Sequence, residues 1–194
     1  PRGFGFGPPS LESNVKLDDD DLEAIRNARG VEEATGVYLL SGEISFHDQI
    51  KYGYIIGSDY EHYTELIQEV YNLDIAQGRP FTGREKNKVF LGHNYELGEK
   101  IFDKAVRLRD TLLVNGKEVT VAGFYDEVGN PQDDSNVYMN VDAIDTLFNP
   151  TSYYYILVRA TQGYNPSVLA DSIREELRQH RNQQRGNEDF FVQT

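Results

Sequence analysis

Residues 111–125, with the sequence TLLVNGKEVTVAGFY, decide how the middle of this chain folds. Apolar residues alternate on both sides of an Asn115-Gly116 pair, and that dipeptide supplies the two positive φ angles of a tight type I′ turn. The sequence therefore predicts a β-hairpin here. A polar loop over 126–136 and a strand and helix over 137–148 are expected to follow it.

Composition limits the classes of function. With 194 residues, 39% of them hydrophobic, the chain can fill the core of one domain or of two small ones. Its 32 acidic and 19 basic side chains give a net charge of −13, so we expect no nucleic-acid partner. The sequence has no cysteine, which excludes disulfides and a thiol nucleophile. No apolar run is long enough to span a bilayer, and a first residue other than Met suggests a segment of a longer protein.

The N-terminal part opens with a lead-in and an acidic helix. Residues 1–16 are rich in glycine and proline, which favours a linker without regular structure. A helix is predicted over 19–29, capped by Asp18 and ended by Gly30. The four consecutive acids that begin at Asp18 could instead attract calcium, but the spacing lacks the glycine and glutamate of an EF-hand loop. Capping is the better interpretation.

The remaining elements follow from periodicity and turn residues. Strands are predicted over 31–46 (as one strand or two), 51–57, 88–92, 153–160 and 190–193, and helices over 63–71, 94–102 and 165–180, with a loop over 72–81. The resulting prediction is an α+β fold with two lobes. Residues 17–60 and 150–194 form a mixed α/β lobe from both ends of the chain, and residues 61–149 form an inserted, strand-rich lobe.

The sequence contains no catalytic motif of the common kinds. A nucleophile elbow, a phosphate-binding loop and a zinc-binding helix are all missing, so we predict no enzyme activity, no cofactor and no metal site. Four histidines occur at isolated positions: His47, His62, His93 and His180. His93 and Asn94 follow a strand, where catalytic groups often lie, but a helix start capped by Asn94 explains them better. Asp133 and Asp134 fit a cation site or a solvated turn equally well.

A group of tyrosines allows two interpretations. They could line a groove for a peptide or a sugar, because aromatic side chains dominate binding sites, or they could cover a half-buried sheet, which we favour. The group consists of Tyr52, Tyr54, Tyr60, Tyr63 and Tyr71.

Eight short stretches occur in an order that is specific even though each stretch is degenerate. They are LDDDDLEAIRNARGVEEATGV, IIGSD, LDIAQGRPFTGRE, VFLGHNYELGEKIF, LLVNGKEVTVAGFYDE, NVYMNVDAIDTLF, YYYILVRA and FFVQT, and together they span residues 17–194. In this order the chain resembles the extracytoplasmic core domain of MacB/FtsX-type ABC transporter permeases.

The resemblance implies a location and a set of partners. Such a domain lies outside the cell membrane, between two transmembrane helices of a permease. The resemblance also implies that the α/β lobe formed by both ends of the chain is similar to the porter modules of efflux pumps. It implies a cytoplasmic ABC ATPase acting through those helices, a second permease copy in a homodimer and an extracytoplasmic adaptor or substrate protein. The resemblance assigns no functional residue to this chain, because the positions that it shares with the family are predicted to form turns and the core.

Our hypothesis from the sequence is therefore a non-catalytic permease domain that transmits ATP-driven movement to export of a substrate or to activation of a partner. The alternative is a stand-alone secreted module that binds a peptide or a glycan. A hydrolase that uses His93 with nearby acids is the weakest of the three.

Overall fold

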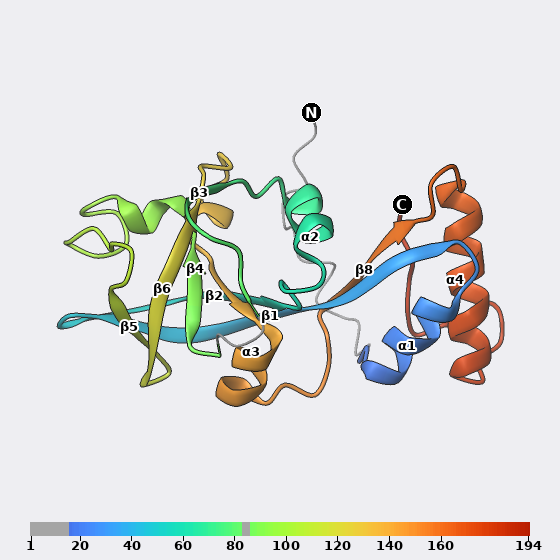
Figure 1. Ribbon diagram of the computed structural model, residues 1–194. Coiled ribbons are helices and arrows are strands. Elements are labelled where there is room, and N and C mark those ends of the chain that lie inside the picture. The colour runs from blue at the N-terminus through green and yellow to red at the C-terminus, as the bar shows by residue number, and fades with distance from the viewer. Residues whose placement is uncertain (1–15, 83–85) are drawn as a thin grey trace. The chain divides into compact units, whose positions relative to one another are not determined.

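The computed structural model describes residues 16–82 and 86–194, so most of the expected lead-in over 1–16 lies outside the described residues. The chain divides into two compact units (Figure 1). The terminal unit consists of Pro1–Gly36 and Thr151–Thr194, and the inserted unit of Val37–Pro150. Helices and strands occur in both, which confirms the mixed α+β class.

The two units divide the chain at residues 36 and 150, whereas the lobes expected from the sequence divide it at 60 and 150. The difference is the hairpin of β1 (Val31–Phe46) and β2 (Gln49–Ser58). These strands pair antiparallel over ten residue pairs, from Val37 with Ser58 to Phe46 with Gln49. All ten residue pairs of this ladder lie within Val37–Pro150, so the whole hairpin belongs to the inserted unit.

The strands of the inserted unit pair in a closed order. From β2 the pairing passes through β7 (Val137–Asn140), β4 (Lys88–Leu91), β6 (Lys117–Tyr125) and β5 (Thr111–Val114) to β1, which pairs with β2 again. The β2–β7 and β4–β6 pairs are parallel and the others antiparallel. A short strand, β3 (Ile75–Gly78), adds to the end of β6.

The core of the inserted unit is apolar and closely packed. Its members, each at most 2% exposed, include Ile44, Ile55, Val89, Leu91, Leu112, Val121 and Met139. Around Tyr138 the rings of Tyr60 and Tyr125 meet its ring edge to face, with centroids 6.5 and 4.9 Å away. Edge-to-face pairs of this kind add to the free energy gained by burial.

The predicted hairpin is confirmed. β5 and β6 are joined by Asn115 and Gly116, whose φ angles are 48° and 77°. Asn115 does more than turn the chain, because its N–H donates to the Glu43 carbonyl (2.9 Å) and its Oδ1 accepts from the Glu43 N–H (2.9 Å). The turn thereby fastens the hairpin to β1.

Most other predicted elements are present. The helices α2 (Thr64–Tyr71) and α3 (Val141–Phe148) form as expected, and β1 is one strand that continues through Gly36 and Gly42. Two of the elements predicted within the inserted unit were wrong. The expected loop over 72–81 contains β3, and the helix expected over 94–102 is only the short 3-10 helix η1 (His93–Glu96). The helix ends at Leu97, whose backbone is extended and which is followed by Gly98, a poor helix former.

The terminal unit packs two helices on the strand β8 (Tyr155–Ala160) and the start of β1. Helix α1 (Asp19–Asn27) has the predicted Asp18 cap, as part of a capping box, and α4 (Pro166–His180) is capped by Asn165. The core combines Leu22, Ile25, Ala28, Ala34, Leu169, Ile173, Leu177 and Phe190. Figure 1 shows α1 and α4 side by side.

The strand expected over 190–193 does not form. Phe190 is 8% exposed and packs into the core of the terminal unit, and the Val192 carbonyl accepts a hydrogen bond from Arg174 (2.8 Å). The apolar run is therefore an irregular tail, and its Phe190 and Val192 pack against the core of the terminal unit. Sequence pattern alone does not distinguish such a tail from a strand.

A charged network joins the two segments of the terminal unit. Arg181 donates to both carboxylate oxygens of Asp21 (2.8 and 2.5 Å), to Asp189 (2.8 Å) and to the Lys16 carbonyl (2.7 Å). Asp21 is 2% exposed. Burial by itself would raise the pKa of Asp21, but the hydrogen bonds from Arg181 and the Asp18 N–H, with the positive charge of Arg181, lower it below its ordinary value.

We predict that Asp21→Asn lowers the free energy of unfolding by about 3 kcal/mol, because it leaves a mostly buried guanidinium without its bidentate partner. Urea denaturation monitored by circular dichroism measures the change. The control is Asp20→Asn, which removes a charge from the same helical turn at an exposed position and should cost less than about 0.5 kcal/mol.

The same pair fixes a pH dependence. Because the pKa of Asp21 is lowered in the folded state, its contribution is present above the unfolded-state pKa of about 4 and is lost as the pH falls through the folded-state pKa. The difference between wild type and Asp21→Asn should therefore shrink on acidification below about pH 4. An unchanged difference in strong acid would contradict the assignment.

Candidate functional site

The fold brings together the two polar groups that the sequence singles out in the inserted unit. Asn94 in η1 donates to the Ser135 hydroxyl (2.8 Å) and to the Pro131 carbonyl (3.4 Å) of the loop that carries Asp133 and Asp134. This close approach needs Gly92, because a Cβ there would lie 2.5 Å from the Asp134 carbonyl oxygen. We predicted that Asn94 caps a helix, and this prediction was wrong. Its side chain is instead a clamp on this loop.

Asp133 and Asp134 are both nearly buried, so the solvated turn that we considered for them is wrong. Asp134 accepts from the Val128 and Gly129 N–H groups (2.7 and 3.2 Å), and Asp133 Oδ2 accepts from Asn130 (2.8 Å). Burial raises the pKa of Asp133, and the charge of Asp134 raises it further, against the Asn130 hydrogen bond. The two carboxylates organise the loop.

The described residues around this loop form no group that could hold a metal ion. Over residues 16–82 and 86–194, no three His, Asp or Glu side chains are arranged to hold a metal ion. His93 Nδ1 lies 3.9 Å from Glu96. Burial, and then the charge of Asp126, raise the pKa of Glu96, opposed by His93, Gln77 and Arg107.

The other three histidines and the acidic run have local partners. His47 is in the β1–β2 turn with its ring 4.2 Å from that of Phe46, His62 lies 2.9 Å from Asp59, and His180 lies 3.9 Å from Asp21. The four histidines therefore contribute to separate local contacts. The acids that follow Asp18 form the capping box and first turn of α1, as expected.

The five tyrosines separate into two groups. Tyr60 is buried and Tyr63 and Tyr71 are half-buried, as expected for residues that cover the core. Tyr52 and Tyr54 on β2 are 79% and 45% exposed. For these two, the favoured interpretation of a half-buried sheet is wrong.

Next to Tyr52 and Tyr54 is a groove of about 280 Å³, which we call the β2 groove. It is lined by residues 51–54 of β2, by Tyr95, Lys100 and Ile101, and by Gln132, Ser135 and Asn136. All of these residues belong to the inserted unit. The loop that Asn94 clamps thus supplies part of the lining.

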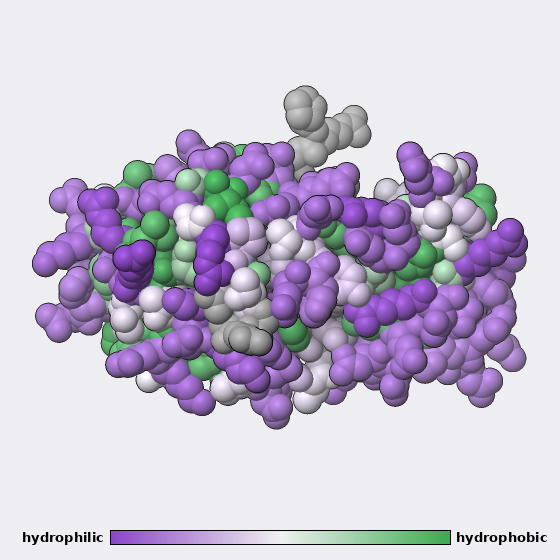
Figure 2. All heavy atoms as spheres, viewed as in Figure 1, coloured by the Kyte–Doolittle hydropathy of each residue, from purple (hydrophilic) through white to green (hydrophobic). Residues whose placement is uncertain are grey.

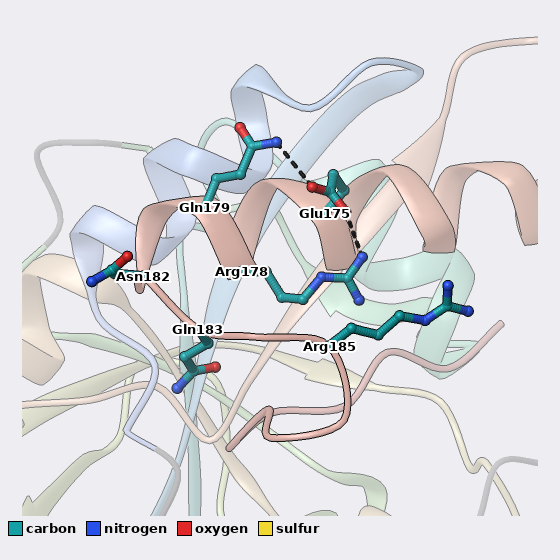
Figure 3. Close-up of a pocket in the computed structure, with 6 residues that line it drawn as sticks. All are labelled: Glu175, Arg178, Gln179, Asn182, Gln183 and Arg185. Atoms are coloured by element: carbon teal, nitrogen blue, oxygen red, sulfur yellow. Dashed lines mark hydrogen bonds and ion pairs between the residues drawn. The ribbon is translucent and has the colours of Figure 1, made fainter.

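A second depression, of about 400 Å³, lies at the C-terminal end of α4 in the terminal unit (Figure 3). Its lining is entirely polar, and the side chains largely bind one another. Arg178 pairs with Glu175 (2.5 Å) and Glu188 (2.9 Å), and Gln179 donates to Glu175 (3.0 Å). Ligand sites usually combine apolar walls with a few polar groups, so the β2 groove is the better candidate.

Sequence reasoning identified two tyrosines of the groove but not its lysines or its loop residues. Lys51 and Lys100 are far apart in the sequence. Residues 95, 100, 132, 135 and 136 lie beside β2 only because the chain folds back on itself. The one local signal is the alternation of exposed aromatic residues around Gly53, which is unusual for a strand in the core of a domain.

Residues 3–176, which include parts of both units, match the MacB-like periplasmic core domain. The chain belongs to this family. Over its whole length it is 27% identical to an ABC transporter permease of Methanocaldococcus jannaschii, and it spans 46% of that protein. The MacB-like resemblance seen in the sequence is thereby confirmed.

Two solved structures share the fold of this MacB-like domain. The extracellular domain of the ABC-type transporter YknZ from Gram-positive bacteria has a TM-score of 0.72 and 18% identity, over 92% of this chain and 90% of that one. The periplasmic region of MacB from Actinobacillus actinomycetemcomitans has a TM-score of 0.71 and 19% identity, over 93% and 82%. At this identity, the likeness concerns the fold.

We predict that Asn94 and His93 respond differently to substitution. Asn94→Ala removes both hydrogen bonds to the 126–136 loop and should lower the free energy of unfolding by about 2 kcal/mol. His93→Ala should change it by less than about 0.5 kcal/mol. Chemical denaturation of the two variants checks this, and equal costs would contradict the clamp.

Proposed function

We propose that this MacB-like chain is the extracytoplasmic domain of an ABC transporter permease and acts as a non-catalytic transmitter of movement. The observation that carries the proposal is the family match over residues 3–176. The Methanocaldococcus relative, of which this chain spans about half, is itself an ABC transporter permease. ATP-driven rearrangement of a cytoplasmic ATPase would reach the domain through the membrane helices of the permease.

The described residues suit a role without chemistry. Acids that could have carried catalysis have structural roles instead: Asp21 and Asp134 accept backbone hydrogen bonds. Asn94 likewise holds the 126–136 loop. None of the helices in residues 16–82 and 86–194 is both long and apolar enough to cross a bilayer. In this proposal other parts of the permease provide the membrane helices.

Transmission of movement requires a rigid body where force is applied. The Asp21–Arg181 pair supplies this in the terminal unit, because one guanidinium binds residues 16 and 21 on one segment and residue 189 on the other. A mostly buried, bidentate ion pair resists displacement of either segment. We therefore assign the terminal unit the role of receiving the movement.

The proposed partners are the ATPase, a second copy of the permease in a homodimer, and an extracytoplasmic protein that is exported, activated or used as an adaptor. The surface agrees with an aqueous location outside the membrane. Figure 2 shows that hydrophilic side chains predominate on the face in view, with apolar side chains in separate groups.

One observation favours a second candidate function. The exposed tyrosines of the β2 groove also fit a secreted module that binds a peptide or a glycan without any permease. The two functions differ in the size and location of the native protein. A membrane protein far larger than 22.1 kDa supports the permease, and a free product of 22.1 kDa supports the secreted module.

We predict that the domain moves when the ATPase binds ATP. The chain has no cysteine, so Val168→Cys on α4 (53% exposed) introduces one spin-label site in the terminal unit of each copy. In the membrane-embedded permease–ATPase complex, the distance between labels on the two copies should differ between nucleotide-free and ATP-bound states. Pulsed electron paramagnetic resonance measures this distance.

The matched control is Leu113→Cys, which places the label on β5 of the inserted unit (37% exposed) and reports whether both units move. A complex whose ATPase cannot bind ATP should keep the nucleotide-free distances. Identical distances with and without ATP at both positions would sink the proposed transmission.

A further inference from the structure

One edge of β2 is only partly occupied. On one side β2 pairs with β1 along its whole length, from Gln49 to Ser58. On the other side it pairs with β7 only from Ile55 to Ser58. Within the described part of the chain, no strand pairs with residues 50–54 on that side. Residues 51–54 of this unpaired stretch line the β2 groove.

The direction in which the backbone groups of residues 50–54 point follows from the two hydrogen bonds between Glu43 and Asn115. Both the N–H and the carbonyl of Glu43 bond to Asn115, on the side of β1 away from β2. In an antiparallel ladder, residues opposite one another either exchange both hydrogen bonds or exchange neither. Tyr52 lies opposite Glu43, so its N–H and carbonyl point away from β1, toward the open edge. By the same alternation, the N–H and the carbonyl of Ile50 also point toward the open edge.

An open edge of this kind is a template for another strand. The unpaired stretch of five residues is about 17 Å long at the usual rise per residue, which is enough for a short extended segment. Tyr52 and Tyr54 lie two residues apart and therefore on one face of the strand, where their rings can flank the side chains of such a segment. Asn136, beside the start of β7, is buried with Oδ1 unpartnered.

The charge of the groove identifies the chemistry of the occupant. The chain carries a net charge of −13, yet the groove lining contains two lysines, Lys51 and Lys100, and no carboxylate. Both lysines are exposed, and neither ammonium has an ion-pair partner among the described residues. A segment with acidic side chains would complement them.

A second copy of this chain fits the groove less well. If the β2 edges of two copies paired about a two-fold axis, Lys51 of one would approach Lys51 of the other, and like charges on directly facing strands destabilise the pairing. The same lysines therefore disfavour self-association and favour an acidic partner.

We propose that residues 50–54 of β2 accept an extended, acidic segment of a partner protein as an added β-strand. Backbone hydrogen bonds at Ile50 and Tyr52 hold the segment, the tyrosine rings flank its side chains, and Lys51 and Lys100 select its charge. This proposal specifies how the extracytoplasmic partner of the proposed function would bind. It rests on the proposed function only for where that partner comes from.

The test uses the 194-residue chain and a fluorescein-labelled octapeptide of alternating glutamate and valine. Fluorescence anisotropy measures binding, and amide hydrogen exchange followed by NMR measures protection. We expect the glutamate peptide to bind about tenfold more tightly than its lysine counterpart, because two ion pairs are exchanged for two repulsions. The bound peptide should slow exchange at the Ile50 and Tyr52 amides.

Two modifications separate strand addition from simple charge attraction. The glutamate peptide with N-methyl groups on alternate amides keeps its charge but cannot form the ladder, so it should not bind. Tyr52→Pro removes an outward N–H that β1 does not use, and it should abolish binding. Tyr52→Val keeps the N–H and should retain binding.

Charge variants test the lysines. Lys51→Glu combined with Lys100→Glu should reverse the preference between the two peptides, and Lys117→Glu, at the β5–β6 hairpin and not among the residues that line the groove, should not. Circular dichroism and the urea midpoint confirm that each variant folds.

Equal binding of the N-methylated peptide, or undiminished binding to a folded Tyr52→Pro variant, would overturn the proposal. Self-association that Tyr52→Pro abolishes would assign the edge to a second copy instead and also overturn it. These results would leave the spin-label test of transmission unaffected, because the binding assay uses the chain alone.

Discussion

The register of the β1–β2 ladder governs the inserted unit. Ten residue pairs place Glu43 opposite Tyr52, and this single alignment determines which backbone groups turn toward β5 and which turn outward. If β2 slipped by one residue along β1, its two faces would exchange and the backbone groups of Tyr52 would turn toward β1 instead of the open edge. The fold therefore fixes the direction of the open edge as firmly as it fixes the core.

Elements with strong local signals could be predicted from the sequence. The Asn115-Gly116 pair supplies the conformations of the turn without help from other residues, and Asp18 and Asn165 cap their helices through groups two or three positions away. Where the decision depended on distant contacts, prediction failed. The run that begins at Phe190 is typical of a strand, but it is instead a tail that packs against the apolar faces of two helices.

The candidate site could be predicted only in part for the same reason. Tyr52 and Tyr54 are visible as aromatic residues, but whether they are covered depends on how far β7 extends along β2. Asp133 and Asp134 occur in a sequence typical of an exposed turn, and the clamp from Asn94 buries them. An unpaired edge is the absence of a neighbour, and apart from the aromatic residues around Gly53 the strand's own sequence gives no signal of it.

The sequence contains a single methionine, Met139, and its position gives the molecule a built-in reporter. Met139 is fully buried on β7, opposite Gly57 of β2, on the strand that stops where the open edge begins. A chain labelled with ¹³C at methionine methyl groups would therefore give one methyl resonance from this domain. Its chemical shift would follow repacking at the junction of β2 and β7 without assignment of any other signal.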